Sequence, residues 1–146
     1  MFVLDTNILS ALMTPEPVPE VVAWVAGQPA RLLFTASICQ AEILSGIAIM
    51  PKGRRRQALE AAARAMFLED FEGRVLPFDT EAAIAYADLF AARRRAGRPT
   101  ATVDLMIASV ARSKGASVVT RDTGGFEHCG VSLINPWGTS FLERDP

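Results

Sequence analysis

Four acidic side chains stand at positions that suit a shared chemical task. They are Asp5, Glu42, Asp104 and Asp122. Asp5 directly follows the apolar run Phe2-Val3-Leu4, and Asp122 lies two residues beyond the apolar run 118–120. If both runs are strands of one parallel sheet, both acids lie at the same edge, beyond the carboxyl ends of the strands, where α/β proteins form their sites.

Glu42 and Asp104 fall within predicted helices, and neither has a lysine or arginine three or four residues away. Surface carboxylates on helices usually have such a partner. A carboxylate that is buried among small and apolar residues needs compensation from a proton, hydrogen bonds or a metal ion. We therefore expect both side chains to be buried and to share a cation with Asp5 and Asp122.

Each acid also has a structural interpretation that needs no cation. Asp5 could cap the helix that follows it. Asp104 could interact with the dipole at the start of its helix, and Asp122 could belong to a turn. Glu42 lies in mid-helix without a partner and has the weakest structural explanation. One shared cation explains four acids at one edge better than four separate coincidences.

Oxygen ligands without histidine or thiolate favour Mg²⁺, with Mn²⁺ as the alternative. Such a site suits phosphoryl chemistry, in which a metal-activated water attacks the phosphorus. We expect Thr6, Asn7 and Thr120 to hydrogen-bond the acids and orient them. The acids could hold one ion tightly or two ions loosely, and the sequence leaves both possibilities open.

Other kinds of catalytic site lack support in the sequence. His128 is the only histidine, so two-histidine catalysis is excluded, and it has no nucleophile-elbow motif beside it. Neither a P-loop nor a GxGxxG motif is present. Cys39 and Cys129 match no metal spacing or disulfide framework. With no apolar run of about 20 residues and no secretion signal, we expect a cytoplasmic protein without membrane contact.

Basic residues occur in two blocks, although the net charge is −1. The blocks are Arg54, Arg55 and Arg56, and Arg93, Arg94 and Arg95. Each block alone is explained equally well as a solvated helix face. Two such blocks beside an acidic metal site predict a binding path for a polyanion such as RNA.

The predicted elements alternate between strands and helices. Strands are predicted at 2–4, 32–35, 74–77, 117–120 and 132–134. Helices are predicted from Asp5 to about 13, at 19–27, at 37–50 with Ser37 as its cap, at 54–71, from Asp79 or Thr80 to about 97, and at 102–115 with Thr102 as its cap. In the helix after Asp79, one apolar stripe is predicted from Ala83, Tyr86, Ala87 and Phe90. This alternation favours an α/β fold with a central, mostly parallel sheet flanked by helices.

At 146 residues, half of them hydrophobic, the chain has the size and composition of one globular domain. We expect a single domain over residues 1–146, with residues 139–146 as a flexible tail.

Several fragments resemble the PIN-domain nucleases. They are Val3-Leu4-Asp5-Thr6-Asn7, Ala41-Glu42-Ile43 with Gly46, Val103-Asp104 followed by Ile107-Ala108, and Thr120-Arg121-Asp122. Three others resemble the VapC toxins, especially their FitB-like branch: Gly53-Arg54-Arg55-Arg56, Leu76-Pro77-Phe78-Asp79 and Ile134-Asn135-Pro136-Trp137. The resemblance extends from Phe2 to about Trp137, and the order and spacing of the fragments make it specific.

This resemblance implies a three-layer PIN-like domain and the toxin of a type II toxin–antitoxin pair. Such toxins cleave RNA with Mg²⁺ or Mn²⁺ and are silenced by a cognate antitoxin. They usually form homodimers that join the antitoxin in larger assemblies, which bind operator DNA through the antitoxin. The family's acidic residues correspond to Asp5, Glu42, Asp104 and Asp122.

One fragment departs from the FitB-like pattern, which often reads Arg-Asn-x-x-Asp-Phe. This chain reads Arg121-Asp122-Thr123-Gly124-Gly125-Phe126. The acid at Asp122 is present, whereas Gly125 stands where a second acid would lie. The departure bears on the occupancy of a second metal site.

Rival functions fit less well. A HAD-type phosphatase needs a second aspartate two residues after the first, where this chain has Asn7. A receiver domain needs paired acids after its first strand and a late lysine, but Asp5 is unpaired and Lys114 lies in a predicted helix. The alternative from another class is a catalytically silent PIN-like binding protein that acts in a DNA-bound repressor complex with its antitoxin.

Overall fold

A five-stranded parallel sheet forms the centre of the computed structural model, which describes residues 1–138. The strands lie in the order β3-β2-β1-β4-β5, and each neighbouring pair is parallel. Their bounds are β1 (Phe2–Leu4), β2 (Leu33–Ala36), β3 (Val75–Leu76), β4 (Ser117–Val119) and β5 (Leu133–Ile134). The expected α/β class with a parallel sheet is confirmed. Residues 139–146, the expected tail, lie outside the described residues.

The central strand β1 lies between two neighbouring strands and is buried. Leu4 pairs with Thr35 of β2 on one side and with Val119 of β4 on the other. Val3, Leu4 and Val119 are fully buried. A strand that is covered on both faces reads as a continuous apolar run, which is why β1 is Phe-Val-Leu without alternation. Where this run stops, at Asp5, the chain reaches the carboxyl edge of the sheet.

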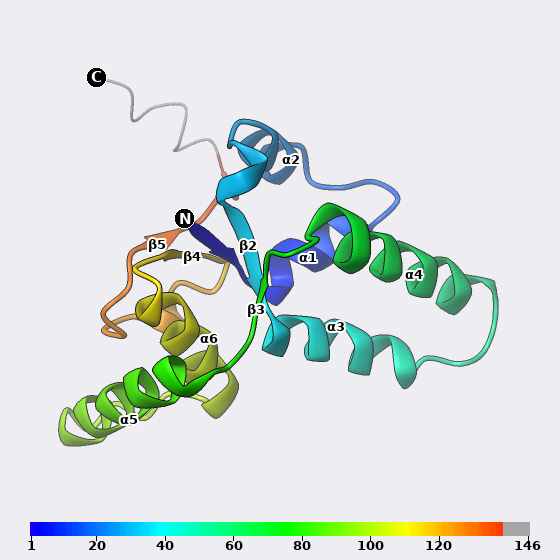
Figure 1. Cartoon of the computed structure of the whole chain (residues 1–146). Helices are drawn as coiled ribbons and strands as arrows, with labels where there is room; N and C mark the ends of the chain where they lie inside the picture. Colours follow the sequence, from blue (N-terminus) through cyan, green and yellow to red (C-terminus); the bar gives the residue numbers. More distant parts are fainter. Residues whose placement is uncertain (139–146) are drawn as a thin grey trace.

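Six α-helices surround the sheet. They are α1 (Thr6–Met13), α2 (Pro19–Ala26), α3 (Ser37–Ala48), α4 (Arg54–Ala65), α5 (Thr80–Arg95) and α6 (Thr102–Ser113). Figure 1 shows α5 and α6 on one side of the sheet and α1, α2 and α4 on the other. Helix α3 packs against α1, α4 and α6, so it joins the two helical layers. None of the helices in residues 1–138 is long and apolar enough to cross a membrane.

Two predicted helix caps were wrong. Ser37 and Thr102 are the first helical residues of α3 and α6, and the residues at the cap positions, Ala36 and Ala101, make no side-chain hydrogen bond there. The chain enters both helices from an extended residue without a polar cap. At the start of α5, the predicted cap Asp79 does accept a hydrogen bond, from the Ala82 backbone amide at 3.0 Å.

The predicted helix 54–71 is divided into two parts. Helix α4 ends at Ala65, and the chain continues as a wider π-helical turn over Met66–Asp70. Met66, Phe67 and Phe71 are all buried. A helix of uniform pitch turns successive residues to different faces, whereas the wider turn lets these three large apolar side chains enter the core.

The apolar stripe predicted for α5 was also wrong. Its buried side chains are Ala82, Leu89 and Arg93, whereas Phe90 of the predicted stripe is 45% exposed. Arg93 belongs to this buried face, and its Nη1 donates a hydrogen bond of 2.5 Å to the Glu127 carbonyl. A buried arginine at the helix end cannot be anticipated from apolar periodicity.

Phe126 offers a test of this packing, because it is 1% exposed and is the largest fully buried side chain of the core. We expect Phe126→Ala to lower the free energy of unfolding by about 3–5 kcal/mol through the cavity it leaves. The matched change Phe90→Ala on the exposed face of α5 should cost about 1 kcal/mol or less. Urea denaturation followed by circular dichroism measures both, and equal losses would contradict the assigned core.

Candidate active site

The four acids converge at the carboxyl edge of the sheet. A pocket of about 530 Å³ there is lined by Asp5, Glu42, Asp104 and Asp122, together with Thr6, Asn7 and other residues of α1. The acids come from the end of β1, from α3, from the first turn of α6 and from the loop after β4. Residues that are up to 117 positions apart in the sequence therefore share one concave site.

Asp5 is the most tightly held of the four. It is 6% exposed, and its Oδ1 accepts a hydrogen bond of 2.7 Å from the Thr6 backbone amide at the start of α1. Its Oδ2 accepts from Thr120 Oγ1 at 2.8 Å and from Asn7 Nδ2 at 3.4 Å. The carboxylate thus caps the helix and also faces the pocket, so the capping interpretation and the site interpretation apply together.

Asn7 and Thr120 connect the two loops that carry Asp5 and Asp122. Asn7 Nδ2 donates to Thr120 Oγ1 at 3.2 Å, and Asn7 Oδ1 accepts from the Arg121 backbone amide at 3.2 Å. Thr120 Oγ1 also accepts from the Asp122 backbone amide at 3.0 Å. Thr6, Asn7 and Thr120 therefore touch the acids or their loops, while their effect on a bound ion stays a prediction.

Glu42 is exposed, which corrects the expectation that it is buried. Helix α3 turns this position toward the open pocket rather than toward the core. Its carboxylate is nonetheless oriented, because Thr6 Oγ1 donates a hydrogen bond of 2.6 Å to Glu42 Oε1. The missing basic partner correctly indicated that Glu42 belongs to the pocket. The expected cause, burial of the side chain, was wrong.

Asp104 and Asp122 also line the pocket. Asp104 is half-buried in the first turn of α6, and Asp122 is exposed. Asp122 Oδ1 accepts a hydrogen bond of 3.2 Å from the Gly125 backbone amide, which holds it in the turn after β4. The turn interpretation of Asp122 is therefore correct, and the residue lines the pocket as well.

Burial dominates the electrostatics of the pocket, and repulsion between the acids adds to it. Burial, with smaller contributions from the charges of Asp104 and Glu42, raises the pKa of Asp5 from 3.8 to about 6 against the hydrogen bonds from Thr120 and Thr6. Burial also raises the pKa of Asp104, with added contributions from the Asp122 and Glu42 charges. Among residues 1–138, no lysine or arginine forms an ion pair with any of the four acids. A cation would relieve this repulsion.

The donor set suits a small divalent cation. Within the described part of the chain, no three carboxylate, thiol or imidazole groups already lie together as a ready-made metal cage. Mg²⁺ does not require one, because it usually keeps several waters and binds through one or two carboxylates. The charge of Asp122 is near enough to raise the pKa of Asp104, and Asp5 and Glu42 share the same pocket.

Two residues of the pocket were missed as site candidates. Arg121 and Trp137 line it, and the Arg121 guanidinium lies 5.3 Å from the centre of the Trp137 ring. A cation beside an aromatic face suits the phosphate and base of a nucleotide. Both residues occur in fragments that resemble the family, and this was the available signal. Neither residue has a spacing that marks it as part of a site.

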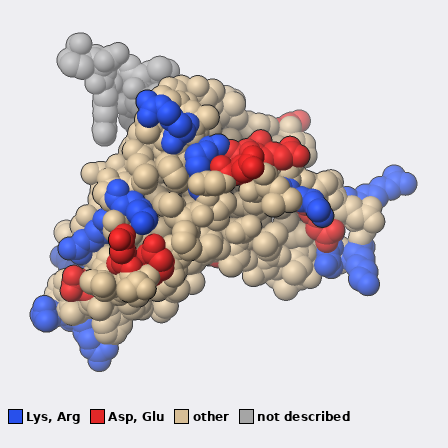
Figure 2. All heavy atoms as spheres, in the orientation of Figure 1, with Lys and Arg blue, Asp and Glu red and all other residues tan. Residues whose placement is uncertain are grey.

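The two arginine blocks do not line the acid pocket. They lie at the start of α4 and at the end of α5, at opposite ends of the molecule in Figure 1. On the face that Figure 2 shows, basic side chains form separate groups rather than one path. Arg93 is buried, and Arg56 is paired with Glu60 at 2.7 Å. Arg93 therefore lacks the exposed position expected for it, and the RNA-binding role of the two blocks stays a prediction.

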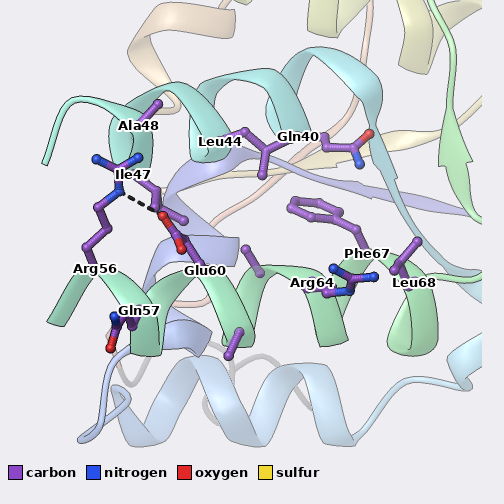
Figure 3. Close-up of a pocket in the computed structure, with 12 residues that line it drawn as sticks. Gln40, Leu44, Ile47, Ala48, Arg56, Gln57, Glu60, Arg64, Phe67 and Leu68 are labelled. Carbon is purple, nitrogen blue, oxygen red and sulfur yellow. Dashed lines mark hydrogen bonds and ion pairs between the residues drawn. The ribbon is translucent and has the colours of Figure 1, made fainter. Parts of the chain in front are cut away.

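A second hollow, of about 620 Å³, lies between α3 and α4 and is lined mainly by apolar side chains (Figure 3). Its one carboxylate, Glu60, is paired with Arg56 across one turn of α4. Leu44 and Leu68, which border the hollow, are 48% and 60% exposed. This lining suits contact with another apolar surface rather than catalysis.

Known proteins match the fold and most of the length of the chain. The PIN domain model matches residues 2–130. The VapC ribonuclease Y4jK of Sinorhizobium fredii is 42% identical over 137 residues, covering 94% of this chain and 98% of the relative. Toxin FitB of Neisseria gonorrhoeae is 34% identical, covering 94% and 99%. A solved structure of FitAB bound to an IR36 DNA fragment superposes with a TM-score of 0.88 at 34% identity, covering 95% of this chain and 97% of that one.

The raised pKa of Asp5 predicts a pH-dependent loss of stability. Because the folded protein favours the protonated form, charging Asp5 as the pH rises through about 6 lowers the free energy of unfolding. Relative to wild type, metal-free Asp5→Asn should therefore gain on the order of 3 kcal/mol between pH 4 and pH 7.5. Thermal denaturation of both proteins in EDTA measures the difference, and a difference that does not change with pH would contradict the burial of this charge.

Proposed function

The chain belongs to the PIN-domain family, in its VapC/FitB-like branch, and on this basis we propose that it is a Mg²⁺-dependent endoribonuclease, the toxin of a type II toxin–antitoxin pair. One observation carries the proposal: four carboxylates that lack basic partners in the described chain converge in one open pocket of a chain that is 42% identical to a VapC ribonuclease. RNA as the substrate class is supported by that relative.

The ion would be held by Asp5, Glu42, Asp104 and Asp122, with Mn²⁺ as a possible replacement for Mg²⁺. When bound, Mg²⁺ supplies a nucleophilic water at neutral pH and offsets the charge that develops on the phosphate. The number of ions is left to measurement.

The chain's own residues would do the orienting. The Thr6 backbone amide and Thr120 fix the two oxygens of Asp5, and the Thr6 hydroxyl fixes Glu42. Thr6 thus holds two acids from different elements in one arrangement, and Asn7 ties their side of the pocket to the loop of Asp122. Such hydrogen bonds to ligands are typically worth 10- to 100-fold in metal affinity or activity.

RNA would enter over the exposed side of the pocket. Arg121 is exposed beside the acids and can bind a phosphate, while the half-buried Trp137 can stack on a base. Both contacts tolerate any sequence, so they explain binding of a single strand without specifying a target.

The partners follow from family membership. We propose that a cognate antitoxin silences the protein, that the protein forms a homodimer and a larger assembly with the antitoxin, and that operator DNA is bound through the antitoxin. The DNA-bound FitAB complex supports this arrangement. Exposed Leu44, Ile49 and Leu68 supply apolar surface of the kind that partners cover. We further propose that the chain acts as one domain in the cytoplasm, where its two free, buried cysteines would stay reduced.

Cleavage of RNA tests the enzymatic proposal directly. Purified protein, freed of any bound antitoxin, is incubated with end-labelled single-stranded RNA and Mg²⁺ or Mn²⁺. We expect cleavage that EDTA abolishes and that Asp104→Asn lowers by at least about 100-fold, because an essential acid of the site loses its charge. Asp88→Asn, the same change at an exposed position of α5 outside the pocket, should cleave as wild type does.

Equal cleavage by Asp104→Asn and wild type would exclude Asp104 from the chemistry. If folded wild-type protein leaves this RNA and a panel of tRNA and ribosomal RNA fragments intact, the silent binding protein becomes the better interpretation.

Glu42→Gln tests the role of Glu42 as a ligand. The amide oxygen can still accept from Thr6, so the variant removes the charge while it keeps the hydrogen bond. We expect calorimetry to show Mn²⁺ binding weakened by about 10-fold or more. Glu69→Gln, at an exposed position away from the pocket, is the control. Unchanged Mn²⁺ affinity in Glu42→Gln would contradict a ligand role.

A further inference from the structure

Gly125 lies directly against two acids of the pocket. It is the middle residue of the 3₁₀ turn Gly124–Phe126, and its backbone amide donates a hydrogen bond of 3.2 Å to Asp122 Oδ1. A Cβ atom on this glycine would lie 2.9 Å from Asp122 Oδ2 and 3.1 Å from Asp104 Oδ2. Both distances are shorter than ordinary van der Waals contacts, so a side chain at this position would have to displace both carboxylates.

Backbone conformation does not explain this glycine. Gly125 is absent from the glycines with positive φ, the conformation in which glycine is ordinarily required. Its neighbour Gly124 provides the comparison, since a Cβ there would meet only Asp122 Oδ1, at an ordinary distance of 3.9 Å. Of these two adjacent glycines, only Gly125 lies so close to carboxylate oxygens that a Cβ atom would crowd them.

We propose that Gly125 is a positioning residue for the metal site: its missing side chain leaves the space in which the Asp104 and Asp122 carboxylates converge. The Asp122 carboxylate occupies the volume where a side chain of residue 125 would begin, and the Gly125 amide holds it there. The inference deepens the proposed function, because it requires that these acids bind a divalent cation.

Small displacements matter here because Mg²⁺ requires oxygen ligands at 2.0–2.1 Å in nearly ideal octahedral geometry. A methyl group at position 125 would push both carboxylates by a few tenths of an ångström. The turn itself stays anchored, because the next residue, Phe126, is buried in the core. The change should therefore act on the ion and leave the fold intact.

Calorimetric titration with Mn²⁺ tests this on three proteins: wild type, Gly125→Ala and the matched control Gly124→Ala. We expect Gly125→Ala to bind Mn²⁺ about 10- to 100-fold more weakly, and Gly124→Ala to bind within about twofold of wild type. Thermal denaturation in EDTA should give the same melting temperature for Gly125→Ala and Gly124→Ala. Equal Mn²⁺ affinity in Gly125→Ala and wild type would overturn the inference, whereas no Mn²⁺ binding by wild type would overturn the proposed function itself.

A rescue variant tests the shared space without relying on the fold of Gly125→Ala. Asp122→Ala should lose Mn²⁺ affinity and empty the volume beside Gly125. The double variant Asp122→Ala/Gly125→Asp should regain part of the loss, because the new carboxylate enters that volume. If the double variant binds no better than Asp122→Ala alone, positions 122 and 125 do not share one carboxylate space, and the inference fails.

Discussion

The rest of the site depends on one electrostatic constraint. A carboxylate is buried at the end of the central strand, and three more acids lie around it. Asp5 is 6% exposed, and its charge is opposed by burial and by the neighbouring acids. Every strong contact to it is a hydrogen-bond donor: the Thr6 amide, the Thr120 hydroxyl and the Asn7 amide group. These donors stabilise the charge only in part, so a cation bound at this edge of the sheet would stabilise the charged acids further.

The parts of this arrangement that depend on strand order could be predicted from the sequence. An unbroken apolar run that ends in an acid indicates a buried parallel strand and places that acid at the carboxyl edge. The acids on helices could be found because Glu42 and Asp104 lack basic neighbours in their own helices. The family resemblance indicated the same four positions independently. The fold that it implied is the fold observed.

What escaped prediction depends on contacts between distant elements. Glu42 is exposed because α3 faces the pocket, and only its contact with Thr6 shows how it is oriented. Arg93 is buried and donates a hydrogen bond to a carbonyl 34 residues away, whereas Arg94 and Arg95 of the same block are exposed. In the sequence, Gly125 stands only for an acid that the FitB-like pattern would have there. The structure shows that two carboxylates lie beside this glycine. Short-range sequence patterns do not show contacts between residues that are far apart in the sequence.

The wide separation of the four acids also has a consequence for synthesis of the chain. Asp122 comes after more than four fifths of the sequence, and the Thr120 amide pairs with Ile134 of the last strand. A ribosome therefore synthesises the final acid and its supporting strand only after the other three acids have been made. A product that stops before residue 122 carries only three of the four acids, so it lacks the complete set that the proposed metal site requires.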